Sequence, residues 1–135
     1  GASLVPKAEA PSAVTFDDTI DAVMTDWSAW AEAQFPDASP GSIFGHAHRE
    51  MKELGLALAR LETANGAGND ADITVCVDEV VDECVDVIML LQQIPRVLGR
   101  ALALAAREKL RVNQDRQWGE PDKAGIVEHI EAVAV

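Results

Sequence analysis

The sequence is poor in basic and aromatic residues and has no tyrosine. Its 135 residues include 23 Asp and Glu against 11 Lys and Arg, which gives a formal net charge of -12. A chain this acidic lacks the basic face that binds nucleic acid, so we expect no nucleic-acid partner. It also lacks an apolar run long and charge-free enough to cross a bilayer, and we expect no membrane partner.

Cysteine is scarce as well, since only Cys76 and Cys84 are present. On one helix these thiols would stand about 12 Å apart along the axis, too far to bridge each other within a chain. Buried free thiols suit a reducing compartment. The opening stretch, Gly1–Pro6, lacks the basic end and apolar run of a secretion signal. We therefore expect a cytoplasmic protein, in the host cytoplasm if the source is viral.

Alanine, valine and leucine are abundant, and 48% of the residues are hydrophobic, a mixture that favours packed helices over sheets. Residues 1–15 contain Pro6 and Pro11 and indicate a flexible N-terminal arm. Residues 16–135 are predicted to form a single all-α domain without strands. Apolar spacing predicts its helices over about 16–34, 43–64, 73–94 or 98, and 100–118.

The expected helix ends follow from capping residues and from proline. Ser42 is the expected N-cap of the second helix and Gly66 its stop, while Asp72 can cap the third. Pro95 should kink or end the third helix, because proline removes a backbone donor and clashes with the preceding turn. Gly99 is a further stop signal.

Two acidic pairs with i, i+3 spacing organise the chain: Glu50 with Glu53, and Glu83 with Asp86. On a helix, each pair projects from one face about one turn apart. The second pair lies in an otherwise apolar helix that should be buried against others. Buried carboxylates are costly unless a cation meets them, and we expect Mg²⁺ or Mn²⁺ arriving with a nucleoside triphosphate.

A third set of polar residues lies on the last predicted helix, where Lys109, Asn113 and Arg116 share one stripe. If the second, third and fourth helices form a bundle, this stripe can face the carboxylates across a groove. Divalent ions there would polarise phosphoryl oxygens, and the cations would stabilise charge on the departing phosphate.

Other phosphate and metal signatures are missing from the sequence. A ferritin-like di-iron bundle requires Glu-x-x-His pairs, which His46, His48 and His129 do not form. No Gly-rich phosphate loop of the Walker type and no serine-elbow signature is found. A non-catalytic helical oligomerisation or regulatory module, with the acids as ordinary charged surface, remains the alternative interpretation.

Four segments together resemble a known family, and they occur in the family's order: Ile43–Leu54, Asp82–Leu91, Lys109–Trp118 and Ile126–His129. The first contains His46, Glu50 and Glu53, and the second is a Glu-x-x-Asp motif. The third reads Lys-x3-Asn-x2-Arg-x-Trp. Over about residues 27–131 the chain is similar to the MazG-like all-α nucleoside triphosphate pyrophosphohydrolases, nearest the dATP/dGTP diphosphohydrolase branch with its phage MazZ-type enzymes.

The resemblance implies an oligomeric four-helix MazG-like bundle that hydrolyses the α–β phosphoanhydride to a monophosphate and pyrophosphate. The substrate would be a purine deoxynucleoside triphosphate, dGTP first and dATP second, and one setting would be modified-DNA synthesis in a phage. Two or three Mg²⁺ or Mn²⁺ ions would be held by the four acids, Glu50, Glu53, Glu83 and Asp86. The phosphates or sugar would contact Lys109, Asn113 and Arg116, with Trp118 over the nucleoside and His46 as a further candidate.

The chain departs from the family pattern at two positions. Arg49 precedes Glu50 where many members have two adjacent Glu residues, which leaves the number of ions open. Cys84 occupies a position that is usually Trp in the family, and this difference is expected to change only the packing. Trp27 and Trp30 are interpreted as core or subunit contacts ahead of ligand stacking. The third helix is apolar almost all round, which predicts a homodimer or homotetramer with the acidic groove near the subunit boundary.

Overall fold

The computed structural model describes residues 19–131, and the flexible arm predicted for residues 1–15 lies outside them. The predicted all-α class is confirmed, because helices of 14 residues or more make up most of this part of the chain. They are α2 (Ile20–Gln34), α3 (Pro40–Ala67), α4 (Asp70–Leu91) and α6 (Leu102–Asp115), with a short α5 (Gln93–Val97) between the last two. Over residues 19–131, none of the helices is both long and apolar enough to span a bilayer.

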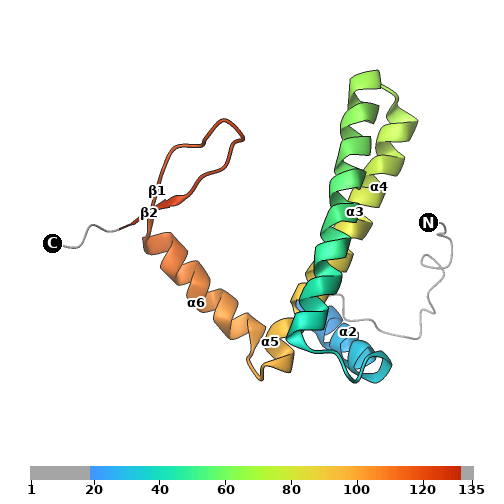
Figure 1. Cartoon of the computed structure of the whole chain (residues 1–135). Helices are drawn as coiled ribbons and strands as arrows, with labels where there is room; N and C mark the ends of the chain where they lie inside the picture. Colours follow the sequence, from blue (N-terminus) through green and yellow to red (C-terminus); the bar gives the residue numbers. More distant parts are fainter. Residues whose placement is uncertain (1–18, 132–135) are drawn as a thin grey trace. The chain divides into compact units, whose positions relative to one another are not determined.

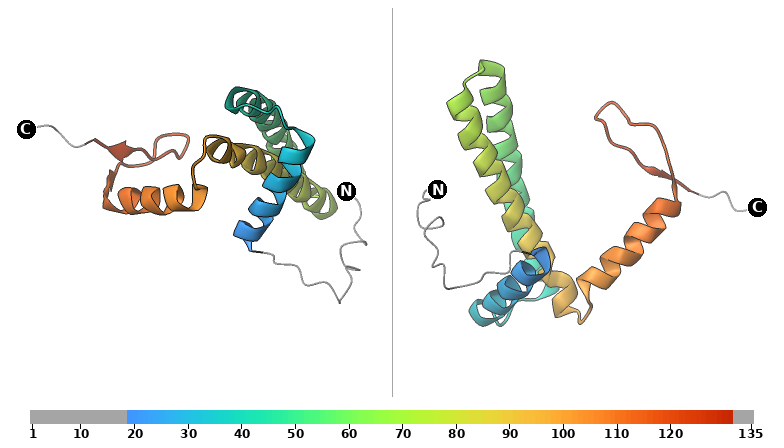
Figure 2. Two further views of the ribbon diagram at one scale, coloured as in Figure 1. Left: turned by 90° about the horizontal axis from the view of Figure 1, so that it is seen from below. Right: turned by 180° about the vertical axis from the view of Figure 1, so that it is seen from behind.

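The chain divides into two compact units that meet between Ile94 and Pro95. The first unit contains the long helices α3 and α4, which run antiparallel and pack along their length (Figure 1). The helix α2 crosses the end of this hairpin where α3 begins and α4 ends (Figures 1 and 2). A buried hydrogen-bond pair joins α2 to that end, as Ser28 Oγ and Gln92 Nε2 lie 3.1 Å apart. The single domain predicted for residues 16–135 stays a prediction.

Small residues allow the close packing of α3 on α4. Ala47, Ala57 and Ala64 are buried along α3, and Val87 and Met89 are buried on α4. Alanine leaves room for the neighbouring backbone, so the two helices contact each other directly over several turns. The carboxylates of both helices are thereby brought to the same height on the hairpin.

The expected caps are wrong by a few residues. Ser39 is the N-cap of α3, and Ser42 is the third helical residue, whose hydroxyl accepts from the Ser39 amide in a reciprocal capping box. The helix ends at Gly68, whose φ of 69° is left-handed, and passes through Gly66 without a break. Asn69 caps α4 through the amide of Asp72.

The predicted break near Pro95 is confirmed, but α4 ends at Leu91, before the predicted 94 or 98, and Pro95 lies within the short α5. The Leu91 carbonyl would need the N–H that Pro95 lacks. Gly99 has a φ of 72° and terminates the short α5 segment. The expectation of no strands is wrong in detail. Beyond α6, β1 (Gln117–Trp118) pairs antiparallel with β2 (His129–Ile130), with Trp118 opposite His129.

Candidate metal centre and adjoining pocket

Three carboxylates from α3 and α4 converge in the first unit. One oxygen each from Glu50, Glu83 and Asp86 lies within 4.8 Å of the others, close enough to share one ion. Residues 33 or more positions apart in the sequence meet here because the hairpin is antiparallel. Hard carboxylate oxygens at this separation are the donor set that Mg²⁺ and Mn²⁺ prefer.

Glu83 is the central acid of this cluster. Its Oε2 atom is buried and has no hydrogen-bond partner. Burial raises the pKa of Glu83, and the nearby charges of Asp86, Glu50 and Glu53 raise it further. An orphaned carboxylate oxygen among like charges is unfavourable, so the residues present fit a cation at this point.

Asp86 has a raised pKa for the same reasons. Burial is the largest cause, followed by the charges of Glu50 and Asp82, and His46 acts in the opposite direction. The charges of Glu50 and Asp86 therefore act on Glu83 from two helices at once. A divalent ion would reverse this balance and favour ionised carboxylates throughout the cluster.

Glu53 lies one turn beyond Glu50 and outside the three-oxygen cluster. Its charge still raises the pKa of Glu83, so it faces the same side of the hairpin. Glu79, one turn before Glu83 on α4, is instead bound by Arg60, with 2.7 Å between Nη2 and Oε2. Glu79 is therefore neutralised by a cation of the protein itself, unlike the three acids of the cluster.

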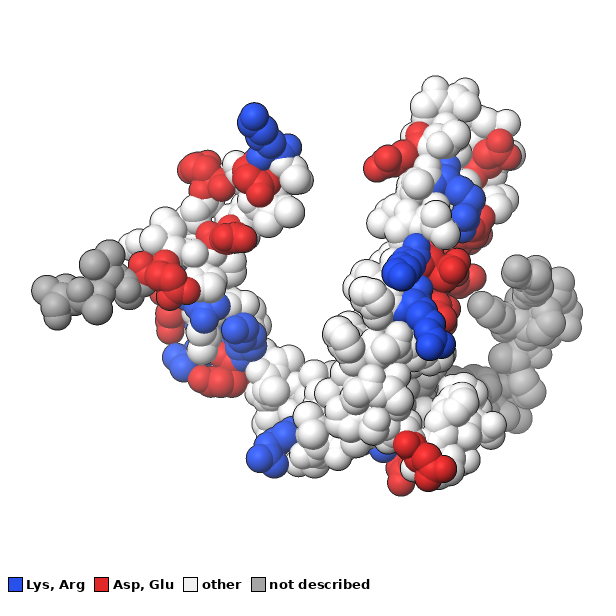
Figure 3. All heavy atoms as spheres, viewed as in Figure 1, with Lys and Arg blue, Asp and Glu red and all other residues white. Residues whose placement is uncertain are grey.

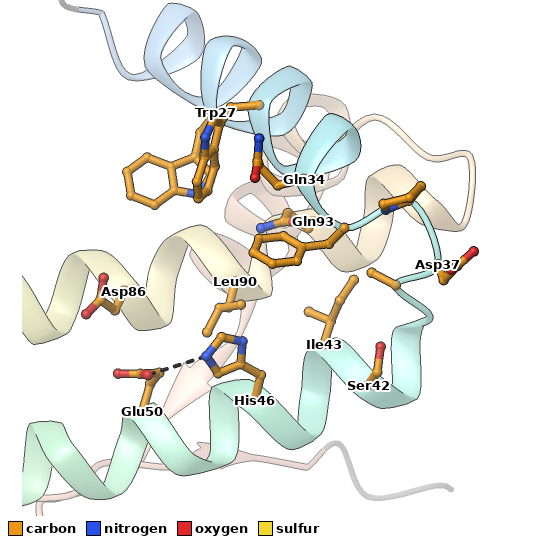
Figure 4. Close-up of a pocket in the computed structure, with 14 residues that line it drawn as sticks. Trp27, Gln34, Asp37, Ser42, Ile43, His46, Glu50, Asp86, Leu90 and Gln93 are labelled. Atoms are coloured by element: carbon orange, nitrogen blue, oxygen red, sulfur yellow. Dashed lines mark ion pairs between the residues drawn. The ribbon is translucent and has the colours of Figure 1, made fainter.

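His46 connects the cluster to a pocket. Its Nε2 lies 3.4 Å from Glu50 Oε1 across one helical turn of α3 (Figure 4). The pocket has a volume of about 600 Å³ and is open to solvent. Glu50 and Asp86 line its acidic end, and His46 and Leu90 lie between that end and the helix α2 (Figure 4).

Aromatic side chains form the far wall of this pocket. Trp27, Trp30 and Phe35 all line it. Their rings follow one another edge to face, with centroids 5.8 Å apart for the two tryptophans and 5.9 Å for Trp30 and Phe35. The amides of Gln34 and Gln93 add hydrogen-bonding groups to the lining.

Trp27 and Trp30 were interpreted as core or subunit contacts, and the core part is wrong, because neither is part of the buried core and Trp30 is 52% exposed. A subunit contact stays a prediction. Helical spacing gives an apolar stripe whether it faces a core or a cavity. One signal was available in the sequence: half of the chain's Trp and Phe residues fall within Trp27–Phe35, directly ahead of the first acidic pair.

The remaining predicted site residues lie in the second unit. Arg116 Nη1 donates to Asn113 Oδ1 over 3.4 Å, and the Trp118 indole donates to the Asn113 carbonyl over 3.0 Å. The Trp118 ring also contacts His129 edge to face. Lys109 is exposed one turn before Asn113. These residues are thus gathered at one end of α6, and their role in binding stays a prediction.

Comparison with known proteins places the fold. No protein-family model matches the chain, and no curated protein does. Among solved structures, the chain is similar to a MazG-like pyrophosphohydrolase from cyanophage S-2L, solved with dGDP and three catalytic Mn²⁺ ions per active site. The two are 24% identical with a TM-score of 0.59, over 85% of this chain and 100% of that one. This likeness establishes a MazG-like all-α fold.

Proposed function

We propose that this protein is a divalent-metal-dependent nucleoside triphosphate pyrophosphohydrolase acting on purine deoxynucleotides, dGTP first and dATP second. Water would add to phosphorus, the α–β phosphoanhydride would break, and the products would be a nucleoside monophosphate and pyrophosphate. One observation carries the proposal: three carboxylates converge within 4.8 Å, and two of them, Glu50 and Asp86, also line an aromatic pocket. The fold shared with a pyrophosphohydrolase that binds dGDP and Mn²⁺ supports it.

Glu50, Glu83 and Asp86 would hold the ions, with Glu53 as a fourth acidic ligand at the edge of the cluster. Mg²⁺ or Mn²⁺ bound there would neutralise the triphosphate and lower the pKa of water. The protein's own contribution would be to keep the acids in place before substrate arrives, since the Oε2 atom of Glu83 is already buried beside Glu50 and Asp86. His46 would position Glu50 and border the substrate. The ions would number two or three.

The pocket suggests how the nucleoside is held. Its acidic end takes the metal-bound phosphates, and its aromatic wall offers Trp27 and Trp30 to a base. Base–aromatic stacking contributes about 1–3 kcal/mol and needs no particular base. The Gln34 and Gln93 amides can then select among bases by hydrogen bonds. A volume near 600 Å³ is in the usual range for small-molecule sites.

The second unit would supply the positive charge. Lys109 and Arg116 would contact the phosphates, Asn113 the sugar or phosphates, and Trp118 the nucleoside. Asn113 already holds Arg116 and Trp118 together through its side chain and carbonyl. We further propose that the protein acts as a homodimer or homotetramer in the cytoplasm, with modified-DNA synthesis in a phage as the setting. The free thiols of Cys76 and Cys84 are consistent with a reducing compartment.

A nucleotide panel tests this function. Purified protein is incubated with each of the common ribo- and deoxynucleoside triphosphates, with Mg²⁺, with Mn²⁺ or with a chelator, and pyrophosphate is measured. We expect pyrophosphate from dGTP and dATP in the presence of metal and none with chelator. The Glu83→Ala variant should lose at least about 100-fold in turnover, because an ion that stabilises developing charge is lost.

The matched control is Asp78→Asn, which removes an exposed acid of the same helix outside the cluster and should keep near-normal turnover. Absence of pyrophosphate from every nucleotide would contradict the proposal. Together with no thermal shift on adding Mn²⁺ and nucleotide, that result would favour the non-catalytic helical module instead.

A further inference from the structure

No lysine or arginine of the described chain lines the aromatic pocket. Those in residues 19–94 are Arg49, Lys52 and Arg60, and all of them are on α3. In Figure 3 the blue side chains on the hairpin stand beside red ones along its length. Because no such cation reaches the aromatic wall, neutral side chains must recognise the part of a ligand that lies there.

Gln93 is the most deeply buried polar residue of the pocket lining within residues 19–131. It is 5% exposed, whereas Gln34 on the helix α2 is an exposed residue. Figure 4 shows Gln93 between Gln34 and Leu90. A buried amide must satisfy both its N–H and its carbonyl group, so the partners that Gln93 already has decide what it offers a ligand.

The Gln93 amide is held in one orientation. Its Nε2 donates to the backbone carbonyl of Met89, 3.1 Å away and one helical turn earlier. A backbone carbonyl can only accept, so the amide cannot flip without losing this hydrogen bond. Gln34 is exposed and can satisfy either end of its amide with water, so its orientation is not fixed in this way.

The carbonyl end of Gln93 is therefore the end available to a ligand. Within residues 19–131, no group donates a hydrogen bond to its Oε1 atom. A ligand that fills the pocket and donates to Oε1 satisfies this acceptor. A ligand of the same shape without a donor displaces water and leaves the acceptor unpaired, which weakens binding.

A buried hydrogen-bond pair holds the aromatic wall in place relative to this acceptor. Ser28 directly follows Trp27 on α2, and Gln92 directly precedes Gln93. Gln92 Nε2 donates to Ser28 Oγ over 3.1 Å, and Ser28 Oγ donates to Gln92 Oε1 over 3.3 Å. Ser28 and Gln92 are both buried. The stacking ring and the acceptor are thus fixed through adjacent residues before a ligand binds, which lowers the cost of binding.

We propose that Gln93 Oε1 accepts a hydrogen bond from the exocyclic amino group of a purine, so that the pocket rejects deaminated purines. This inference rests on the proposed function, which places the base against the aromatic wall. The amino group is the donor that guanine and adenine share, and hypoxanthine has none. At C6 hypoxanthine presents an oxygen, which repels Oε1. Gln93 is therefore a specificity-determining residue.

Isothermal titration of the full chain with dGMP, dAMP and dIMP, in the presence of Mn²⁺, tests this contact. The nucleotide dIMP lacks the amino group of both others, and we expect it to bind at least about tenfold more weakly. Gln93→Met removes the acceptor at similar side-chain volume, so the three affinities should then agree within about threefold. Leu91→Met is the control, because Leu91 is exposed nearby and outside the pocket, and it should keep the wild-type difference.

The wild-type comparison requires no variant, so a folding defect in Gln93→Met, visible by circular dichroism, does not affect it. A wild-type affinity for dIMP equal to that for dGMP or dAMP would overturn the proposal. Absence of binding by all three nucleotides would do the same, as would an undiminished preference in a folded Gln93→Met. Release of pyrophosphate from dGTP together with equal affinities would remove this inference alone and leave the proposed function standing.

Discussion

Glu83 illustrates how function and stability oppose each other within one residue. The same burial and negative neighbours that would favour a bound cation raise its pKa in the folded, metal-free protein. An acid with a raised folded pKa binds more protons in the folded than in the unfolded state. The free energy of unfolding therefore falls as the pH rises from 4.5, the ordinary pKa of this carboxyl, through the raised pKa of Glu83 in the folded protein.

A Glu83→Gln variant is expected to show this directly. Without metal, it should melt at a higher temperature than the wild type at neutral pH, because the repulsion from Glu50 and Asp86 is gone. Near pH 4 the difference should shrink, since Glu83 is then protonated in both states of the wild type. The difference in melting temperature between the variant and the wild type is measured by circular dichroism in the presence of a chelator, over pH 4–8. A difference that is constant with pH would contradict this electrostatic account.

Trp27 gives a second prediction, for recognition of the base. The Trp27→Leu variant keeps an apolar side chain and removes the stacking surface, so KM for the preferred nucleotide should rise about 5- to 100-fold. Hydrolysis of inorganic tripolyphosphate, which has no base, should change less than twofold.

Ile20→Ala is the control for this variant, because Ile20 is an exposed apolar residue of the same helix outside the pocket. Its KM should match the wild type. If Trp27→Leu also left KM unchanged, the base would not lie against this wall.

At the scale of the elements, the α3–α4 hairpin and its acids follow closely from sequence. The spacing of Glu50, Glu83 and Asp86 places them on helix faces, and the apolar character of α4 predicts its packing. The aromatic wall could not be predicted in this way, because it depends on how α2 crosses the hairpin. Trp27 and Trp30 would show the same helical spacing in a buried core.

Helix ends were predicted less well, since several residues in each link can serve as caps. Ser39 and Ser42 both suit an N-cap, and Gly66 and Gly68 both suit a stop. The choice depends on local geometry: only Gly68 takes the left-handed conformation, with φ 69°. The strand pair after α6 was missed because each strand is only two residues long.

The two glycines provide a matched test of this helix end. Gly66→Ala should raise the free energy of unfolding by about 0.5–1 kcal/mol, because alanine suits a helix better and its methyl group meets no atom within 4 Å. Gly68→Ala should lower it by about 1–2 kcal/mol, because alanine is strained at this φ. Urea unfolding measures both. Equal effects of the two substitutions would show that the helix does not end at Gly68.

At the scale of the whole molecule, the residues of the proposed site are divided between two units. The first unit contains the carboxylates and the pocket, and the second contains the predicted phosphate-binding residues, Lys109 and Arg116. The spacing of Lys109, Asn113 and Arg116 predicts that they share one face of α6. It does not predict which other surface of the protein that face contacts.

Binding of Mn²⁺ to the protein tests the central claim most directly. Isothermal titration of the full chain should show saturable Mn²⁺ binding for the wild type and for Asp78→Asn, tightening when dGMP and pyrophosphate are present. Glu83→Gln should weaken Mn²⁺ binding at least about tenfold, because the central ligand of the cluster loses its charge. Equal Mn²⁺ affinity in Glu83→Gln and the wild type would contradict the claim that Glu50, Glu83 and Asp86 form a metal centre.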